Sequence, residues 1–368
     1  MYDCIIVGAG VIGLMTALEL RAAGVTVALV ERGRVGGESS WAGGGILSPL
    51  YPWRYAPAVN RLAAWGRRRY AALTAELLAE TGIDPEYDSG GLVMMDAGEE
   101  LAALAWARES AEPVEAVTSA ALLARAPAVR PFAGEALLFP EVARVRNPRL
   151  VRALHAAALA RGIAVLDVVE VTALRVVGGR FVAAETPSGP IPGGSCVLAA
   201  GAWSAGLLSP LPPAVAVAPV KGEMVLFRGP PGLLSAVVLE AGRYVIPRRD
   251  GRVLVGSTLV HAGFDCLPTP AARQELVEAG RRIAPALGEV PIEAHWAGLR
   301  PGAPAGIPYI AKHPAVTGLF LNAGHYRNGL VMAPAAARLC ADLVLGRPPV
   351  LDPAPYAWDA LRPDSGWD

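Results

Sequence analysis

Residues 3–31 read DCIIVGAGVIGLMTALELRAAGVTVALVE, and this stretch decides the fold. An apolar strand, Asp3–Val7, leads into glycines with GxGxxG spacing. A helix over about Val11–Ala23 follows, and a second apolar strand closes at Glu31. A lone GxGxxG is weak evidence, but here the strand, the helix and the acid all stand at the expected distances. The stretch therefore predicts a dinucleotide-binding βαβ unit.

Each glycine of the motif has a physical role. Gly8 permits the tight turn, Gly10 lets the backbone approach a pyrophosphate, and Gly13 lets the helix and strand pack closely. The N–H groups at the start of the helix face the phosphates. Glu31 lies where a carboxylate accepts the ribose hydroxyls of an adenosine. The alternative is a glycine-rich turn in another kind of α/β protein.

Composition excludes some classes of function. The 368 residues carry 33 Lys and Arg against 33 Asp and Glu, so the chain offers no general charge for nucleic acid or an anionic membrane. No stretch reaches about 18 consecutive apolar residues, and the chain enters its first strand at once, without a secretory pattern. We expect a cytoplasmic protein with no membrane or nucleic-acid partner.

The reactive residues form no metal or nucleophile motif. The five histidines show no HExxH spacing, and the chain has neither a Walker A loop nor a nucleophile elbow, so no metal is predicted. The cysteines have no CxxC spacing and are predicted to be small buried thiols in a reducing compartment: Cys4, Cys196, Cys266 and Cys340.

The rest of the chain alternates between two kinds of layer. Helices are predicted over 59–81, 98–127 (one or two), 147–162 and 269–287, with Asn147 as a cap, and strands over 90–96, 163–169, 196–203 and much of 215–295. Residues 1–50, 140–214 and 297–368 are assigned to a discontinuous nucleotide-binding domain, and residues 51–139 and 215–296 to a substrate or cap domain with an antiparallel sheet. The active site is expected between them.

Four segments outside the first motif can carry chemistry. The loop 39–46 allows backbone contact along a flat ligand, or is a flexible surface loop. Arg300 in HWAGLRPG can clamp a carboxylate, or form a surface salt bridge. GHYRNGLVMAP, 324–334, opens a helix near Gly329 toward a ligand, or is an ordinary turn. Tyr244 shares a strand face with Ile246 and faces the cleft, or packs in the sheet.

Together these segments resemble a known family. The opening unit, GGESSWAGGGILSP, CVLAAGAW, HWAGLRPG and GHYRNGLVMAP occur in the order found in FAD-dependent oxidases of the D-amino-acid oxidase superfamily, and more narrowly in ThiO-type glycine oxidases. The resemblance covers the whole chain. It implies an FAD-binding Rossmann-like domain of the glutathione-reductase type with an inserted antiparallel-sheet substrate domain, and a non-covalent FAD.

The resemblance also implies roles for individual residues. Arg300 would clamp the substrate carboxylate, Tyr244 would offer it a hydroxyl, and Arg327 would support binding. The residues implied for FAD are Gly8, Gly10, Val11, Ile12 and Gly13 at the pyrophosphate, Glu31 and Arg32 at the ribose, Ser39, Ser40, Gly44, Gly45 and Ile46 along the phosphates and isoalloxazine, Val171 near the adenine, Gly201, and His325, Tyr326, Arg327, Asn328, Gly329, Leu330 and Val331 at the flavin pyrimidine edge.

Three positions depart from the family pattern. Trp41 stands where a small residue is expected, so the wall beside the flavin is expected to differ. Gly242 stands where some relatives carry a polar side chain. The stretch after Arg300, GIPYIAKHP, lacks the cysteine through which sarcosine oxidases attach flavin, which argues against covalent FAD.

The implied reaction is oxidative deamination of glycine and of small amines such as sarcosine or small D-amino acids. The imine gives glyoxylate and ammonia, O2 gives H2O2, and in thiamine synthesis the imine would serve the thiazole. The family implies a homotetramer. One alternative is a D-amino-acid dehydrogenase that passes electrons to quinone, with Arg67–Arg69 beside Trp65 as a membrane-docking candidate. Another is an FAD-bound structural subunit without turnover, which loss of Arg300 or Tyr244 would have favoured.

Overall fold

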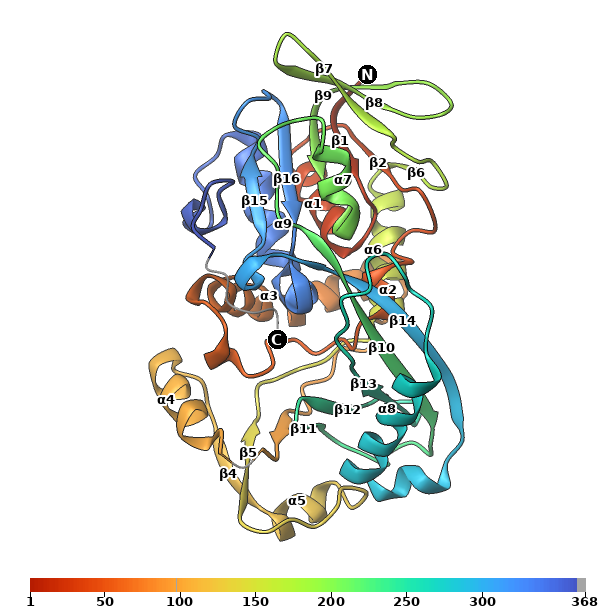
Figure 1. The fold of residues 1–368 in the computed structure, drawn as a ribbon, viewed down its shortest axis with the longest axis vertical. Coiled ribbons are helices and arrows are strands. Elements are labelled where there is room, and N and C mark those ends of the chain that lie inside the picture. The colour runs from red at the N-terminus through yellow and green to blue at the C-terminus, as the bar shows by residue number, and fades with distance from the viewer. Residues whose placement is uncertain (97, 363–368) are drawn as a thin grey trace.

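The computed structural model describes residues 1–96 and 98–362, which form two eight-stranded sheets and their covering helices (Figure 1). The strands of the first sheet are β1 (Tyr2–Val7), β2 (Val27–Val30), β6 (Ala164–Leu166), β7 (Ala173–Val177), β8 (Arg180–Glu185), β9 (Ile191–Leu198), β15 (Tyr309–Lys312) and β16 (Leu319–Ala323). Those of the second are β3 (Leu92–Met94), β4 (Glu115–Thr118), β5 (Glu135–Phe139), β10 (Ala218–Arg228), β11 (Val237–Glu240), β12 (Arg243–Pro247), β13 (Arg252–Gly256) and β14 (Ile292–Gly302). The α-helices are α1 (Val11–Ala22), α2 (Ser39–Ala42), α3 (Pro57–Thr81), α4 (Glu100–Ser110), α5 (Ser119–Arg125), α6 (Asn147–Ala160), α7 (Ser204–Leu208), α8 (Pro270–Ile283) and α9 (Gly329–Leu345).

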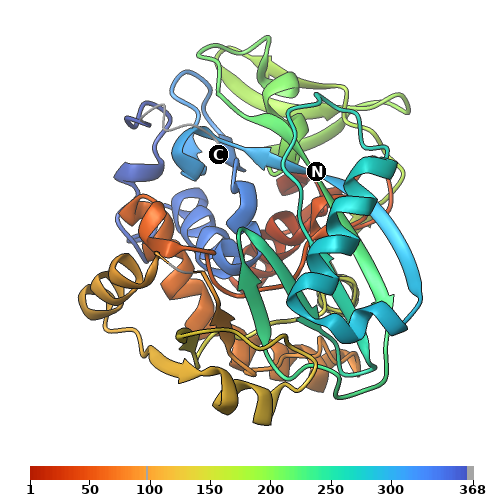
Figure 2. The ribbon, with the colours of Figure 1, turned by 60° about the horizontal axis from the view of Figure 1, so that its bottom comes forward.

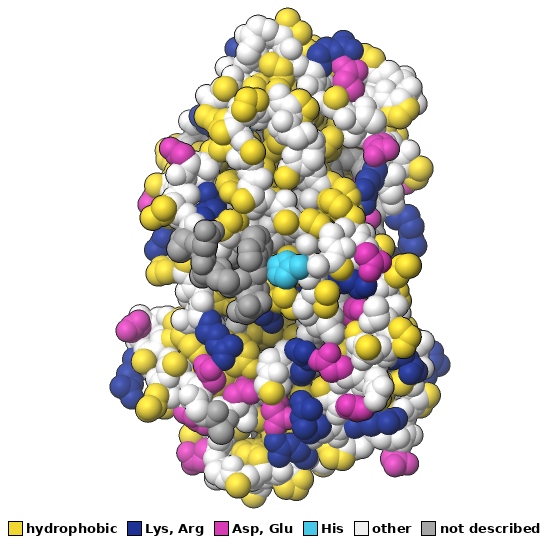
Figure 3. Space-filling view, in the orientation of Figure 1, with side chains coloured by type: hydrophobic (Ala, Val, Ile, Leu, Met, Phe, Trp, Pro, Cys, Tyr) yellow, Lys and Arg dark blue, Asp and Glu magenta, His cyan; other side chains and the backbone are white. Residues whose placement is uncertain are grey.

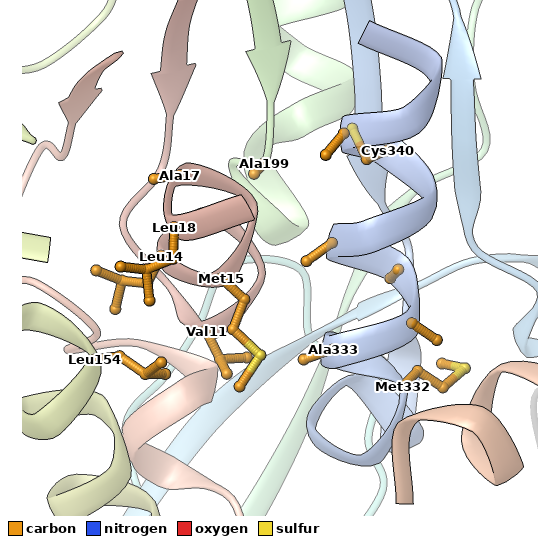
Figure 4. Close-up of a cluster of buried hydrophobic side chains, with 14 of the residues drawn as sticks. Val11, Leu14, Met15, Ala17, Leu18, Leu154, Ala199, Met332, Ala333 and Cys340 are labelled. Carbon is orange, nitrogen blue, oxygen red and sulfur yellow. The ribbon is translucent and has the colours of Figure 1, made fainter. Parts of the chain in front are cut away.

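The first sheet is the nucleotide-binding layer expected from residues 3–31. Its order is β15-β16-β9-β1-β2-β6, and β1 pairs in parallel with both β2 and β9. Buried apolar side chains fix α1 and α9 against each other. Figure 4 shows Val11 and Met15 of α1 beside Ala333 of α9, with Leu14 on the side of Leu154 in α6. The α/β fold class is confirmed.

The second sheet is almost entirely antiparallel, in the order β14-β10-β13-β12-β11-β3-β5-β4, with β11 and β3 parallel. Helix α8 covers one of its faces (Figure 2), where Leu276 and Ile283 pack in one cluster with Val225 and Val253. The long strands β10 and β14 pair from Ala218–Gly302 to Phe227–Ile292. In Figure 1 they run from the first layer down into the second sheet, so they join the two.

The division into domains stays a prediction. Helix α3, which the sequence analysis groups with the cap, packs on α9 and α6, and its buried Leu62 and Tyr70 belong to the core around α1. Helix α9 lies within the span Tyr326–Leu345, which is long and apolar enough to cross a membrane. That span is a core helix of this protein, because 67% of its apolar window is buried.

The structure corrects several local predictions. Asn147 is the first residue of α6 rather than its cap, and its Nδ2 donates to the Ser40 carbonyl at 3.1 Å. Strand β4 interrupts the helical region predicted over 98–127, strands β5 and β15 were not predicted, and the predicted loop 39–46 begins with the short α2. Cys4, Cys196 and Cys340 are buried as expected, but Cys266 is exposed because it lies in a surface loop. On the face in Figure 3, acidic and basic side chains are interspersed, mainly over the lower half.

Candidate active site

One cavity of about 550 Å³ takes its walls from both sheets. Most of the residues predicted for the site line it: Gly8, Gly10, Val11, Ile12, Glu31, Arg32, Ser39, Ser40, Gly44, Gly45, Ile46, Val171, Gly201, Tyr244, Arg300, His325, Tyr326, Arg327, Asn328, Gly329 and Leu330. Segments up to about 300 positions apart in the sequence therefore meet at one place. Gly13 and Val331 are not among the lining residues.

The two predicted residues outside the wall have packing roles. A Cβ on Gly13 would lie 1.9 Å from the Gly8 carbonyl oxygen, so only glycine lets α1 approach the turn that closely. Val331 is 1% exposed and belongs to the core around α9. A Cβ on Gly66 of α3 would lie 2.0 Å from the carbonyl oxygen of Val331, so the two helices pack closely at this point. Gly13 has the packing role predicted for it, whereas Val331 is not brought to the cavity.

The start of α1 forms one wall of the cavity. Gly8 has a φ of 104°, and a Cβ there would lie 2.5 Å from the Ala199 carbonyl oxygen, so this turn requires glycine. The Val11 N–H donates to Ser40 Oγ at 2.9 Å, and the Ser39 hydroxyl donates to the Leu299 carbonyl at 2.7 Å. These bonds tie the loop 39–46 to both α1 and β14.

The end of β2 supplies a fixed carboxylate. Glu31 accepts hydrogen bonds from the backbone N–H groups of Ala9, at 2.8 Å, and Gly33, at 3.0 Å. Beside it, the Arg32 guanidinium lies 3.7 Å from the centre of the Trp203 ring and pairs with Glu38 at 2.8 Å. Trp203 also lines the cavity and was not among the predicted site residues. This end presents a carboxylate and a stacked guanidinium–indole pair.

Arg300 lies in the cavity wall at the far end of β14. Its Nη1 donates to the carbonyls of Thr258, at 3.1 Å, and Lys221, at 3.3 Å, and its Nη2 donates to Ser257 Oγ at 2.7 Å. Burial lowers the pKa of this guanidinium from its ordinary value, and the charge of Arg327 lowers the pKa further. Arginine stays protonated even so. A partly buried cation that lacks a carboxylate partner within residues 1–96 and 98–362 is suited to a ligand carboxylate.

Space for Arg300 depends on Gly222. A Cβ on Gly222 would lie 2.2 Å from both Nη1 and Nη2 of Arg300. We expect Gly222→Ala to displace the guanidinium and weaken the binding of acetate, a minimal carboxylate ligand, by about 2 kcal/mol, or ~30-fold. Calorimetric titration measures this, with Gly288→Ala as control, because a Cβ on Gly288 meets no atom within 4 Å. Unchanged acetate affinity in Gly222→Ala would contradict the placement of Arg300.

Tyr244 faces the same end of the cavity. Its ring lies near Gly44, and its hydroxyl donates to Met224 Sδ at 3.6 Å. A thioether is a weak acceptor. The hydroxyl can therefore exchange this partner for a carboxylate at little cost. Met224 lines the cavity and was not predicted, since nothing in its strand distinguishes it from a core residue.

Arg327 adds a second positive charge close to Arg300. It lies in the short turn Tyr326–Asn328 before α9 and is partly buried. Within residues 1–96 and 98–362 it has no ion-pair or hydrogen-bond partner. Two guanidiniums and a phenol thus converge where few protein acceptors compete for them.

Four amide or imidazole atoms fit the cavity to a polar, flat ligand. Asn147 Oδ1, Asn322 Oδ1, His325 Nε2 and Asn328 Nδ2 are buried without a hydrogen-bond partner in the described part of the chain, and all four residues line the cavity. Buried polar groups almost always have partners. A dinucleotide with ring nitrogens, carbonyls and hydroxyls supplies them, so the residues present fit FAD. Asn147 was mistaken for a helix cap because Asn-Pro is a common helix start.

The burial of His325 leads to a prediction about how stability depends on pH. It is 2% exposed, and burial lowers the pKa of its imidazole to about 3. The ordinary value is about 6.5. Above pH 6.5 the ring is neutral in both states. Between pH 6.5 and 3 the unfolded chain binds a proton that the native protein does not, so stability falls as the pH falls.

We therefore expect His325→Gln to reduce the loss of unfolding free energy between pH 6 and 4 by about 1 kcal/mol per pH unit. Denaturant unfolding of both proteins at several pH values measures the difference. Identical pH slopes for the two proteins would contradict the neutral, buried state of this ring.

Two positions that depart from the family pattern lie outside the cavity wall. Trp41 is 43% exposed, and its ring lies 5.2 Å from that of Trp296, so it does not form the wall beside a ligand as expected. Gly242 lies in the turn between β11 and β12 with a φ of 71° and donates its N–H to Tyr51 Oη at 3.0 Å. The turn conformation explains this glycine.

Known proteins are similar to this chain in both sequence and architecture. Glycine oxidase of Pseudomonas aeruginosa is 51% identical over 96% of this chain and 97% of its own length. The crystal structure of glycine oxidase from Geobacillus kaustophilus superposes with a TM-score of 0.91 at 32% identity, over 97% of this chain and 98% of that one. The bifunctional protein ThiO/ThiG of a Nostoc species is 33% identical over 93% of this chain, which matches 52% of that protein.

A family model agrees with these similarities. It matches residues 3–343, nearly the whole chain, and so includes all but the first residue of the two sheets and every predicted site residue. The βαβ unit, the cavity with its unpartnered polar atoms and the two guanidiniums are thus parts of one shared architecture. The chain belongs to the FAD dependent oxidoreductase family, DAO.

Proposed function

We propose that this protein is an FAD-dependent oxidase that deaminates glycine, and also small amines such as sarcosine or small D-amino acids. The imine formed hydrolyses to glyoxylate and ammonia, and O2 becomes H2O2. The observation that carries the proposal is Arg300, a partly buried guanidinium that lines the cavity and pairs with no carboxylate of the described chain. The 51% identity to a glycine oxidase supports the choice of substrate.

When bound, FAD would supply the acceptor for a hydride from the substrate Cα and the route of the electrons to O2. The protein binds and orients the substrate. Arg300 holds the carboxylate with charge-assisted hydrogen bonds, and the Tyr244 hydroxyl leaves Met224 Sδ to donate to the same carboxylate. Arg327 adds attraction for the anion.

No side chain is assigned as a general base. Among the described lining residues the carboxylates are Glu31, Glu38 and Glu170. Glu31 and Glu38 are engaged beside Arg32, at the end assigned to the ribose. His325 is neutral and buried. The amino acid must therefore react as the free amine, and kcat/KM is expected to rise with pH toward the pKa of the substrate amine.

Each segment of the cavity wall is assigned to one part of FAD. We assign Gly8, Gly10, Val11 and Ile12 to the pyrophosphate and Glu31 and Arg32 to the ribose. The loop 39–46 and the turn 325–330 are assigned to the phosphates and flavin. Asn147 and Trp203, which line the same wall, are added to this set. FAD is held without a covalent bond, since the stretch after Arg300 has no cysteine.

We also propose a metabolic setting. The Nostoc relative joins a ThiO part to a ThiG part in one chain. The glycine imine made by this protein would serve the thiazole of thiamine, in the cytoplasm and in a homo-oligomer. Light scattering of the purified protein tests the oligomer, and thiamine-dependent growth of a strain lacking the gene tests the setting.

The dehydrogenase alternative is not favoured. Three relatives that are 33–51% identical to this chain are named as glycine oxidases. The basic stretch suggested for membrane docking is engaged within the fold, since Arg67 pairs with Glu112 and Arg69 pairs with Glu76 at 2.7 Å. Trp65 beside them packs against the core around α1.

Oxygen-electrode assays test the proposed function. With glycine, sarcosine, D-alanine and D-proline as separate substrates, we expect O2 uptake with glycine and one H2O2 formed per O2. Catalase should then return half of the oxygen. An absence of O2 uptake with all four substrates would exclude the oxidase function.

A further inference from the structure

The two faces of strand β10 lie in different surroundings. Gly222 and Met224 line the cavity, whereas Lys221 and Glu223 are not among the lining residues. Successive side chains of a strand point to opposite faces. Lys221 is 2% exposed and Glu223 is 1% exposed, so a cation and an anion are buried on the face away from the substrate.

Buried charges of this kind need partners. Lys221 Nζ lies 2.8 Å from Asp265 Oδ2 and 3.8 Å from Glu223 Oε1. His295 Nε2 lies 2.9 Å from Glu223 Oε2. The carboxylate also accepts hydrogen bonds from the backbone N–H of Thr269, at 2.8 Å, and from its hydroxyl, at 3.1 Å.

These partners fasten one loop, residues 257–269, to β10. Near its start, Thr258 Oγ1 accepts from the Glu223 N–H at 2.9 Å, and Val260 exchanges two backbone hydrogen bonds with Lys221. Further along, Asp265 binds Lys221, and Thr269, the N-cap of α8, binds Glu223. The loop is thus attached at both ends and at two points between them.

The start of the same loop holds Arg300. Ser257 and Thr258 supply two of the three protein acceptors of its guanidinium, and Lys221 supplies the third through its carbonyl. Arginine has five N–H donors. The three bonds leave the Nε–H and one N–H of Nη2 for a ligand. Where the loop lies therefore decides where those remaining donors point.

From these contacts we propose that Glu223 is a positioning residue for Arg300, acting through the loop 257–269. It fixes the loop from the face that the substrate never touches, and so sets the guanidinium for the carboxylate. This inference rests on the proposed role of Arg300 as the carboxylate clamp.

The variant Glu223→Gln tests the proposal in the FAD-loaded enzyme. Glutamine keeps the shape but loses the charge and one acceptor for Thr269. We expect KM for glycine to rise about tenfold with kcat within twofold, because the carboxylate is held less tightly to the same extent in the ground state and the transition state. The Kd for glycolate, a carboxylate ligand without an amine, should rise by the same factor, read from its effect on the flavin absorbance.

Two further variants sharpen the test. Glu293→Gln is the matched control, because Glu293 is a carboxylate on β14 that pairs with Arg228 and Arg252 instead of the loop. Its KM should equal that of the wild type. Asp265→Asn removes only the Lys221 anchor, and Asp265 is 48% exposed, so the variant should fold even if Glu223→Gln does not. It should raise KM for glycine two- to threefold.

Wild-type values for KM and glycolate Kd in both Glu223→Gln and Asp265→Asn would overturn the proposal, as would a fall in kcat at constant KM. An inactive wild-type enzyme would instead overturn the proposed function. Even then, the glycolate titration would test the positioning role of Glu223 separately from the proposed function, because it requires no turnover.

Discussion

Arg300→Ala raises KM for glycine by about a thousandfold. Removing one partner of a buried, charge-assisted pair typically costs about 2–5 kcal/mol, and 4 kcal/mol corresponds to that factor. The variant also leaves the buried Ser257 hydroxyl and Thr258 carbonyl without this donor, and it removes one of the two donors to the Lys221 carbonyl, which keeps the Val260 N–H. Steady-state kinetics with glycine measures the effect.

Arg300→Lys is the matched control for charge. Lysine keeps the cation but cannot hold three acceptors and a carboxylate in a planar fork. We expect an intermediate KM, and FAD content equal to wild type in both variants. A KM for glycine that does not change in Arg300→Ala would show that the carboxylate binds elsewhere in the cavity.

The second large effect is on the cofactor. Gly13→Ala yields a protein that is purified without FAD and is less stable by about 3 kcal/mol. A Cβ at position 13 would lie 1.9 Å from the Gly8 carbonyl oxygen, a contact that real Cβ atoms never make. Relief requires the turn 8–10 or the start of α1 to move, and Gly8, Gly10 and Val11 are parts of the cavity wall.

The FAD content after gel filtration and the urea midpoint measure this effect. Gly288→Ala again serves as control and should keep both values, since no atom lies within 4 Å of its Cβ position. A yellow Gly13→Ala protein with full FAD would show that the close approach of α1 to the turn is not required for binding.

Local signals predicted the first layer well. The β1–α1–β2 boundaries lie within two residues of those expected, because the glycine spacing, the apolar strands and the helix are all encoded within 29 residues. Strands β4 and β5 escaped prediction. The first is a short, mostly exposed edge strand, and its pairing with Leu137 and Leu138 of β5 depends on the tertiary fold rather than on its own sequence.

The site was predicted in part, from the resemblance to a family and not from local sequence signals. Arg300 and Tyr244 were assigned by resemblance, and the structure places both in the cavity wall. The acceptors that orient Arg300 could not be found, because two of them are backbone carbonyls and carry no sequence signal. The prediction for Trp41 was wrong, because a departure from the family pattern does not reveal which way the ring turns.

An anaerobic titration of the FAD-loaded protein with glycine tests the central claim most directly. We predict that the flavin absorbance band at about 450 nm disappears when glycine is added and returns when air is admitted, with one H2O2 released per flavin. Bleaching that does not reverse in air would contradict the oxidase assignment in favour of a dehydrogenase. A band that glycine leaves unchanged would contradict the substrate itself.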